Sequence, residues 1–228
     1  MKNTLNVIAA APLFNGLSVD ALQAIRAIAL HRDYEKGQTI FSEGDPGDGF
    51  YIVATGCIKI YKLSAEGKEQ ILHIFGDGEP FGEVPVFSGK PFPASAQTIR
   101  RSSLLFFPKP AFIAAIAQNP SLALSMLGIL SLRLREFTVQ IENLSLKEVP
   151  GRLSSYLLYL SGEQKNPVSV KLNISKSQLA SLLGTIPETL SRILGKMAAS
   201  RLIRVQGSDI QILNREELQN LSETGKLA

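Results

Sequence analysis

The spacing of hydrophobic and polar positions changes along the chain, and each change predicts a different kind of element. Residues 15–31 place Leu22, Ile25 and Ile28 at helical spacing after Ser18, a residue suited to cap a helix. From residue 32 to about 109, short apolar runs are separated by glycines, which is typical of a compact antiparallel barrel or roll. These runs are Gln38–Phe41, Phe50–Ala54, Cys57–Leu63, Gln70–Phe75 and Ser103–Phe107, with a hairpin turn at 65–68.

Helical spacing returns over residues 110–116 and 120–147. The second of these segments carries an apolar seam that alternates steps of three and four residues, at Leu127, Leu130, Leu134, Phe137, Ile141 and Leu144. Such a seam is typical of a helix that packs against its own copy. The alternative is a helix packed only on its own domain, which needs a broader stripe. Leu132, Val139 and Leu146 broaden it, so we expect two partners: a second copy of the chain and the roll.

A third segment follows the break at Val149-Pro150-Gly151, which we interpret as a hinge. It contains a helix over 151–161, a polar connection over 162–167, two closely spaced helices, and a hairpin formed by Leu202–Val205 and Ile210–Leu213. The fold class is therefore predicted as α+β. We expect a sensing roll over 1–119, a dimerisation helix over 120–147 and a DNA-binding domain over 148–228.

The two close helices predict a helix-turn-helix. Ser175 with Gln178 has the spacing of a capping box, and Gly184 supplies the positive φ of a tight turn. Thr185 with Glu188 has the same spacing and predicts a second capping box, with a proline tolerated in the first turn of that helix. Two short helices joined through such a turn, followed by a hairpin, indicate a winged helix-turn-helix.

The second helix of this motif divides into an apolar and a polar side. We expect Leu190, Ile193, Leu194 and Met197 to be buried, and Pro187, Glu188, Ser191 and Arg192 to lie on the side that faces DNA. Arginine can bind guanine through two hydrogen bonds, and glutamate can accept one from cytosine. Two alternatives stay open: Glu188 serves only as a cap, and Arg192 only contacts phosphate. Thr189, Ser175, Lys176 and Lys196 complete the expected DNA-binding set.

Charge and cysteine content narrow the function. The net charge is +4, and residues 147–204 carry 9 Lys and Arg against 3 Asp and Glu, a local excess that suits a polyanion. The single Cys57 cannot form an internal disulfide or hold an iron–sulfur cluster. We find no phosphate-binding loop, metal-spaced His/Cys set, signal peptide or run of 18 uncharged apolar residues. We therefore expect a cytoplasmic protein that is neither an enzyme nor membrane-bound.

Roll, long helix and winged helix-turn-helix, in this order, resemble the CRP/FNR family of bacterial transcription regulators over nearly the whole chain. The matching segments are Phe41-Ser42-Glu43-Gly44-Asp45, Phe50–Gly56, Ile58-Lys59-Ile60-Tyr61, Phe81-Gly82-Glu83 and Pro187-Glu188-Thr189-Leu190-Ser191-Arg192. The resemblance implies a homodimer that binds double-stranded DNA, contacts RNA polymerase and responds to a small-molecule or gas effector. The Glu-x-x-Ser-Arg pattern implies palindromic operators with TTGA-type half-sites.

The same resemblance implies an effector pocket formed by Gly82, Glu83, Phe92, Pro93, Ala94, Ser95, Phe137 and Thr138. Members that bind cyclic AMP carry an Arg-Ser pair for its phosphate about ten residues after the Gly-Glu pair. This chain has Phe92-Pro93-Ala94-Ser95 there, and Phe137 stands where those members offer a hydroxyl to the adenine. An anion without its arginine binds poorly, so we expect that cyclic AMP is not the effector.

The remaining likeness is to the DNR and HcpR groups of the family, which sense nitric oxide through haem. It rests on Leu144-Ser145-Leu146-Lys147 and on the Pro-Glu-Thr-x-Ser-Arg motif. The resemblance makes haem b the candidate cofactor, with His73 as a possible iron ligand beside Ile71 and Phe75 on one strand face. The alternative for His73 is a simple packed histidine. For His31, the other histidine, we expect a place at a helix end, where it stabilises the helix dipole.

Overall fold

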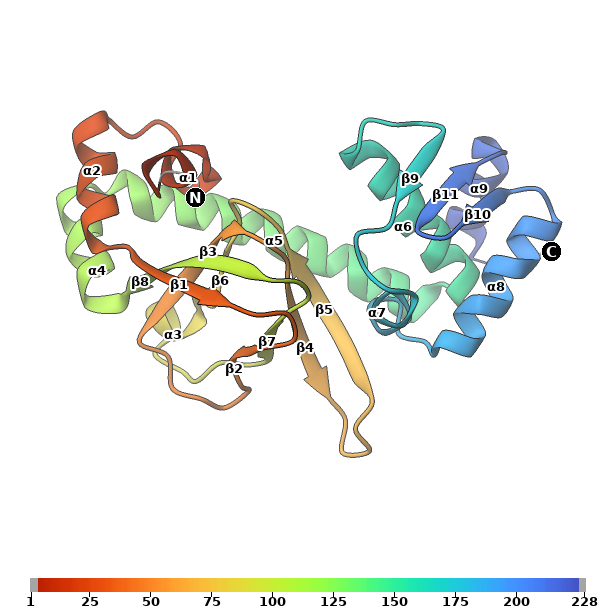
Figure 1. Ribbon diagram of the computed structural model, residues 1–228, viewed down its shortest axis with the longest axis horizontal. Coiled ribbons are helices and arrows are strands. Elements are labelled where there is room, and N and C mark those ends of the chain that lie inside the picture. Colours follow the sequence, from red (N-terminus) through yellow and green to blue (C-terminus); the bar gives the residue numbers. More distant parts are fainter. Residues whose placement is uncertain (1–3, 226–228) are drawn as a thin grey trace. The chain divides into compact units, whose positions relative to one another are not determined.

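The computed structural model describes residues 4–225 (Figure 1). They form two compact units that divide between Leu134 and Arg135. The long helix α5 (Ser121–Leu146) contributes its first half to one unit and its second half to the other. The predicted α+β class, with a roll, a long helix and a C-terminal helix-turn-helix, is confirmed.

The first unit begins with helix α1 (Thr4–Ala10), the short 3-10 helix η1 (Pro12–Phe14) and helix α2 (Val19–Ile28). The Ser18 hydroxyl accepts a hydrogen bond from the amide of Ala21, so the predicted cap of α2 is confirmed. The prediction that this helix continues to residue 31 was wrong. Residues Leu30–Tyr34 form strand β1, which pairs with β8, and this long-range pairing outweighs local helix propensity. His31 therefore lies in a strand and cannot stabilise a helix end.

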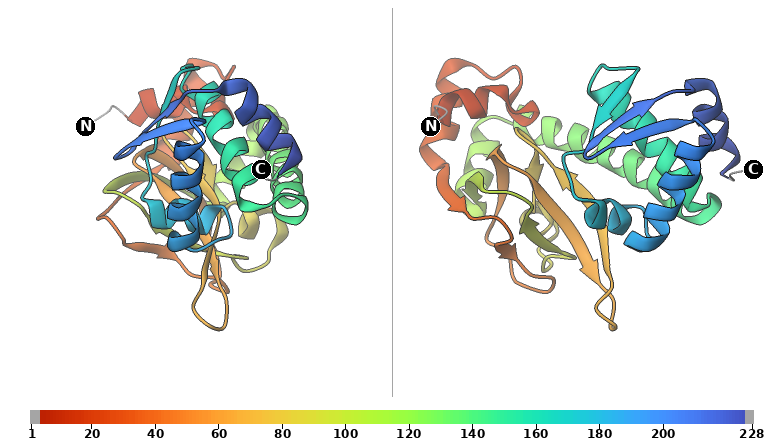
Figure 2. Two further views of the ribbon diagram at one scale, coloured as in Figure 1. Left: turned by 90° about the vertical axis from the view of Figure 1, so that its right-hand side faces the viewer. Right: turned by 45° about the vertical axis from the view of Figure 1, so that its right-hand side comes forward.

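Two four-stranded antiparallel sheets form the roll within the described residues, in the orders β1-β8-β3-β6 and β2-β7-β4-β5. The five predicted runs all appear as strands, and β1, β6 and β7 are additional. Gly67, at a φ of 79°, closes the predicted turn between β4 and β5, and Figure 2 shows this hairpin extending beyond the rest of the roll. The strands other than β1 are β2 (Thr39–Phe41), β3 (Gly49–Thr55), β4 (Ile58–Leu63), β5 (Glu69–Phe75), β6 (Pro80–Phe81), β7 (Ser95–Thr98) and β8 (Ser102–Pro108).

The two faces of the sheet β1-β8-β3-β6 serve two separate cores. Because side chains alternate along a strand, Phe50 and Ile52 on β3 and Leu105 on β8 face one way, toward α1, α2, α4 and α5. Their neighbours Val53 and Leu104 face the interior of the roll. That interior is rich in aromatic rings, and Phe41 and Phe92 stack there with centroids 3.7 Å apart.

Helix α3 (Val84–Ser88) lies between β6 and β7 in the sequence, and α4 (Lys109–Gln118) and α5 follow β8. The first half of α5 packs on the roll through Leu122, Met126, Ile129 and Leu130. Within the predicted seam, Leu127, Leu134 and Ile141 are 58–66% exposed, whereas Leu130 is in contact with the roll core. The expected packing of α5 on the roll is thus confirmed, while Leu132, Val139 and Leu146 are all at least half exposed.

The second unit contains α6 (Val149–Glu163), β9 (Ser169–Lys171), α7 (Lys176–Leu182), α8 (Pro187–Ala199), β10 (Ile203–Gln206), β11 (Asp209–Ile212) and α9 (Arg215–Thr224). The predicted hairpin is confirmed as β10 and β11, to which β9 adds a third strand. The break after α5 falls at Lys147 and Glu148, and Pro150 lies inside the first turn of α6, where it needs no hydrogen-bond partner. Sequence spacing therefore placed the start of α6 two residues late.

One close backbone approach fixes the packing of α6 on α9. A Cβ added to Gly151 would lie 2.5 Å from the Cα of Gly225, so these helices meet only because residue 151 lacks a side chain. The core beneath the helix-turn-helix holds Leu179, Leu190, Ile193, Leu194 and Met197 together with Ile203 and Ile210 from the hairpin. The predicted buried side of the second helix is thus confirmed.

Candidate DNA-binding surface and effector region

Helix α7 begins with the predicted capping box. The Ser175 hydroxyl accepts from the amide of Gln178 at 3.2 Å, and the Gln178 side chain accepts from the amide of Ser175 at 2.9 Å. Gly184 follows the helix at a φ of 66°, the left-handed conformation that glycine adopts without strain. The turn therefore leads directly into α8.

The start of α8 differs from the prediction. Ile186 occupies the N-cap position, no side chain caps the helix, and Pro187 lies in its first turn. The proline pushes the preceding residue into an extended conformation, here a ψ of 155°, so the helix cannot begin at Thr185. The second capping box predicted from Thr185 and Glu188 was wrong. The alternative that Glu188 serves only as a cap loses its structural basis.

The side of α8 opposite its buried residues is polar and exposed. Glu188, Ser191 and Arg192 lie there, with Pro187 at the start of the helix and Lys196 one turn further on, all exposed. Thr189 is partly buried between the two sides. The i, i+3, i+4 spacing of Glu188, Ser191 and Arg192 brings these three side chains onto one face near the helix N-terminus, the end that contacts base edges in this motif.

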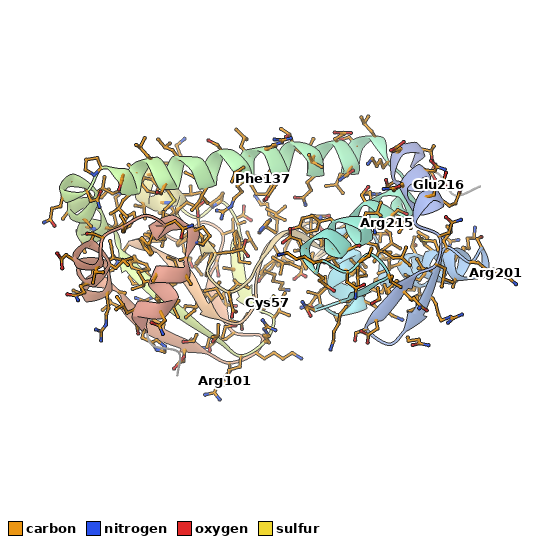
Figure 3. The ribbon with its side chains drawn as sticks, turned by 90° about the horizontal axis from the view of Figure 1, so that it is seen from above. Cys57, Arg101, Phe137, Arg201, Arg215 and Glu216 are labelled. Atoms are coloured by element: carbon orange, nitrogen blue, oxygen red, sulfur yellow. The ribbon has the colours of Figure 1, made fainter. Side chains whose placement is uncertain are left out.

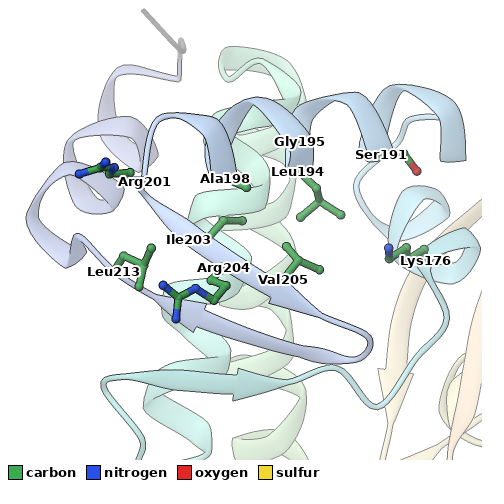
Figure 4. Close-up of a pocket in the computed structure, with 10 residues that line it drawn as sticks. All are labelled: Lys176, Ser191, Leu194, Gly195, Ala198, Arg201, Ile203, Arg204, Val205 and Leu213. Carbon is green, nitrogen blue, oxygen red and sulfur yellow. The ribbon is translucent and has the colours of Figure 1, made fainter.

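A groove runs between α8 and the hairpin β10–β11 (Figure 4). It encloses about 660 Å³, and its polar lining includes Lys176 from α7, Ser191 from α8, and Arg201 and Arg204 from the hairpin side. Arg201 stands at a φ of 55°, which turns the chain from α8 into β10. Sequence reasoning missed Arg201 and Arg204 as site residues. A signal was present in the sequence, because both arginines fall in the basic segment, Arg201 just before the predicted strand Leu202–Val205 and Arg204 within it.

The arrangement supplies two kinds of contact to a DNA duplex. Arg192 and Glu188 can bond to base edges, while Lys176, Lys196, Arg201 and Arg204 offer positive charge to phosphates. Ser175 is exposed, but its hydroxyl already accepts the capping hydrogen bond, so any contact it makes to DNA uses its remaining capacity.

The predicted effector region lies in the roll around Gly82 and Glu83. Gly82 has a φ of 73°, and a Cβ there would meet the rings of Phe41 and Phe92. The buried Glu83 carboxylate accepts a hydrogen bond of 2.7 Å from Arg133, whose other nitrogen donates to the carbonyl of Pro80 at 2.8 Å. Arg133 also lies over the ring of Phe75. The main partner of Glu83 was missed, because α5 brings Arg133 from fifty residues away in the sequence.

The segment Phe92–Ser95 is packed rather than charged. Phe92 and Ala94 are buried, Pro93 is exposed, and the Ser95 hydroxyl accepts from the amide of Glu43 at 3.0 Å. Phe137 and Thr138 belong to the second unit, and the Thr138 hydroxyl donates to the carbonyl of Arg135 in its own helix. That these two residues complete the effector pocket stays a prediction.

His73 lies in β5 with its ring 4.4 Å from that of Phe75, as predicted. Burial, together with the nearby charge of Arg133, lowers the pKa of His73 to about 4. The imidazole is therefore neutral near pH 7. His73 and Ile71 were predicted to lie on the same face of the strand. A β-bulge interrupts the alternation of side chains between them, because His73 pairs with Ile60 of β4 whereas Ile71 pairs with the next residue, Tyr61.

Known protein families match both units of this chain. A family model for the cyclic nucleotide-binding domain matches residues 31–119, and one for the Crp-like helix-turn-helix domain matches residues 151–221. The CRP-like cAMP-activated global transcriptional regulator of Mycobacterium tuberculosis is 31% identical over 216 residues, 93% of this chain and 96% of the relative. The fumarate and nitrate reduction regulatory protein of Vibrio cholerae is 29% identical over 218 residues, 93% of this chain and 85% of the relative.

Solved structures of related regulators have the same fold. FixK2 from Bradyrhizobium japonicum superposes with a TM-score of 0.76 at 25% identity, covering 88% of this chain and 99% of that one. The catabolite activator protein of Thermus thermophilus superposes with a TM-score of 0.55 at 28% identity, covering 95% of this chain and 100% of that one. The fold and the helix-turn-helix thus define a DNA-binding transcription regulator. The chain belongs to the CRP/FNR family.

One further property bears on membrane association. Within residues 4–225, no single helix is long and apolar enough to cross a bilayer; only the pair α4 and α5, bent by 115°, passes on length and composition.

Proposed function

We propose that this regulator is a homodimer that reads an inverted repeat of TTGA-like half-sites and is controlled by an effector other than cyclic AMP. The observation that carries the operator assignment is the exposed face formed by Glu188, Ser191 and Arg192 at the start of α8. Arg192 holds the guanine through O6 and N7, Glu188 accepts from the cytosine paired with it, and Ser191 lies against the neighbouring thymine. The basic groove residues anchor the flanking phosphates.

Dimerisation is supported by the exposed apolar residues Leu127, Leu134 and Ile141 on α5. They recur at intervals of seven residues, the repeat of a two-helix seam. A two-fold dimer places its recognition helices about one helical turn of DNA apart, which sets the spacing of the half-sites. Such a regulator acts in the bacterial cytoplasm, together with RNA polymerase.

A gel-shift experiment tests the operator assignment. The full-length protein is titrated with a duplex that carries two TTGA-type half-sites, and with a control duplex in which both guanine–cytosine pairs are replaced. We expect the first duplex to bind at least tenfold more tightly at a fixed salt concentration. Equal binding would refute the operator sequence, and no binding to either duplex would favour an effector-binding adaptor that does not contact DNA.

The case against cyclic AMP rests on the segment that would hold its phosphate. Phe92 is stacked on Phe41, Pro93 carries no charge, and the Ser95 hydroxyl is already bonded to the backbone of Glu43. Relatives named for cyclic AMP make this nucleotide the main alternative. Isothermal titration at sub-millimolar cyclic AMP should give no saturable heat. Saturable binding in the micromolar range would overturn this part of the proposal.

We propose haem b as the cofactor, with His73 as its iron ligand. Iron ligation requires a neutral imidazole, and a pKa of about 4 keeps the ring of the half-buried His73 neutral near pH 7. The iron of bound haem would supply the site for nitric oxide. The alternative is another small molecule bound inside the roll.

The two histidines of the chain provide a matched test of haem binding. Purified protein is titrated with ferrous haem and then with carbon monoxide or nitric oxide, and the absorption spectrum is recorded. We expect His73→Ala to lose the ligated spectrum and His31→Ala to retain it. An unchanged spectrum in His73→Ala, or no haem binding by the wild type, would leave another small molecule as the effector.

A further inference from the structure

A second recess lies on the outer side of the roll, where α1 approaches the sheet β1-β8-β3-β6. It encloses about 440 Å³, a size within the usual range for small-molecule sites. Its lining comes from α1, from strands β1, β3 and β8, and from the turn before β8. This recess opens on the face of the sheet that looks toward the helices, whereas Phe41 and Phe92 belong to the core inside the roll. It is therefore separate from the predicted effector pocket.

The floor of the recess is apolar and shaped by an irregularity in β3. Val7, Ala54 and Leu105 line it, and the register between β3 and β8 shifts between Val53 and Thr55. A β-bulge at this point bends the strand and re-aims the neighbouring side chains. Because residue 54 is an alanine, the bulge leaves open space where a larger side chain would fill the floor.

Three polar side chains on one wall are already aligned. His31 and Asp33 lie two residues apart on β1, so they share a face, and Ser103 pairs directly opposite Asp33 on β8. The Nε2 atom of His31 lies 2.7 Å from the Ser103 hydroxyl, and its Nδ1 atom lies 3.8 Å from the Asp33 carboxylate. One of these two groups donates the hydrogen bond to the other, and in either tautomer of His31 the Ser103 oxygen keeps at least one lone pair available to a ligand.

The order Asp, His, Ser also occurs at activated nucleophiles. Here the 3.8 Å separation is too long for the hydrogen bond that orients a base, and the Asp33 side chain is 64% exposed. The arrangement is therefore better suited to hold a ligand than to activate the hydroxyl.

A positive charge at the rim completes the recess. Arg101 lines the recess and projects from the surface (Figure 3). Its one ion pair among the described residues is a 3.5 Å contact from Nε to the Glu35 carboxylate. Both side chains are more than three-quarters exposed. Such an exposed ion pair contributes little to the stability of the fold. Because the contact uses Nε, both terminal nitrogens of the guanidinium remain available to a ligand. These two nitrogens can bind a carboxylate through parallel hydrogen bonds.

We propose that this recess binds a small metabolite that carries a carboxylate beside a hydroxyl or amino group. Arg101 takes the carboxylate, and the Ser103 oxygen accepts from the hydroxyl or amine. The Asp33 carboxylate favours an amine that is charged, and the short carbon chain lies over Ala54 and Leu105. A bound molecule would bridge α1 and the sheet. The proposal does not depend on the identity of the effector inside the roll.

The test screens the common L-amino acids together with lactate, glycerate and malate at millimolar concentration. Thermal unfolding of the full-length protein is followed for each compound, and compounds that raise the melting temperature are titrated by calorimetry. We expect at least one to bind saturably. Arg101→Gln should weaken its binding about tenfold or more, and Ser103→Ala should weaken it less. Ala54→Val should weaken it by filling the floor.

Arg26→Gln provides the matched control, because Arg26 is an exposed arginine on α2 outside the recess. It should leave the affinity unchanged. The proposal fails when none of these compounds binds, or when binding survives both Arg101→Gln and Ala54→Val without loss. A variant that does not melt cooperatively is replaced by Arg101→Lys, which keeps the charge but loses the paired geometry and should also weaken binding.

Discussion

The two units of this protein place their functional residues in different ways. In the second unit, the DNA-facing residues fall within about thirty positions, from Ser175 on the cap of α7 to Arg204 on β10. In the roll, the charged pair of the effector region joins Glu83 to Arg133, fifty residues apart. A recognition helix can be identified from sequence because its face follows from helical spacing. A pocket in a roll is assembled by strand pairing and by a distant helix, which spacing does not reveal.

The charges of the two units also differ in their surroundings. Arg133 is largely buried and bonded on both sides, so it is part of the structure of the roll. Lys176, Arg192 and Lys196 are exposed and form no ion pair within residues 4–225. Exposed, unpaired cations on one surface remain available to phosphates and bases. Function in the second unit should therefore depend on these local side chains and on the helix that pairs two copies.

The largest expected effect comes from α5, which contributes residues to both units. Leu134→Glu or Ile141→Glu places a charge in the dimer seam, which should yield monomers and abolish operator binding at micromolar concentration. Sedimentation measures the oligomeric state. Leu132→Glu is the control, because Leu132 is equally exposed but lies outside the seam, and it should remain dimeric. A monomeric wild type at this concentration would contradict the assignment.

Arg192→Ala should have the next largest effect. Loss of two hydrogen bonds to guanine should cost about 1–3 kcal/mol per half-site and flatten the preference at that base. Competition gel shifts with all four bases at the guanine position measure both quantities. If Arg192 contacts only phosphate, affinity falls but the order of preference among the four bases stays as in the wild type.

Glu188→Gln should change selectivity more than affinity. The structure places no capping hydrogen bond on Glu188, so the variant loses a carboxylate in the first helical turn, at a cost of about 0.3–1 kcal/mol in stability. We expect selection from randomised sites to show a relaxed preference at the cytosine. Thr185→Ala serves as the control and should leave preference and stability nearly unchanged. Full sequence preference in Glu188→Gln would show that this residue does not read a base.

The smallest effect is expected from the phosphate contacts. Lys176→Ala or Lys196→Ala should weaken every duplex alike and reduce the slope of log affinity against log salt by about one unit for each contact removed. Filter binding over a range of salt concentrations measures the slope. Lys68→Ala, in the turn of the β4–β5 hairpin of the roll, is the control and should not alter it. A slope that does not change in Lys176→Ala would remove this residue from the DNA-binding set.

Most elements of both units could be predicted from sequence, because glycine punctuation and apolar spacing reflect local geometry. The failures have specific causes. Leu30 and His31 were predicted to end a helix, because the partner strand β8 lies some seventy residues away and leaves no local signal. The start of α8 departs from the capping-box spacing because Pro187 holds Ile186 in an extended conformation. The recess under α1 was missed because His31 and Ser103 meet only through strand pairing.

The sequence by itself determined the helix-turn-helix, its buried and exposed sides and the apolar repeat of α5, since each depends on interactions between residues a few positions apart. Tertiary structure alone decided that Glu83 bonds to Arg133, that the surroundings of His73 lower its pKa, and that His31 faces Ser103 beside an open recess. These contacts join segments that only strand register and helix packing bring together. Spacing along the chain carries no information about which of many possible partners such a side chain meets.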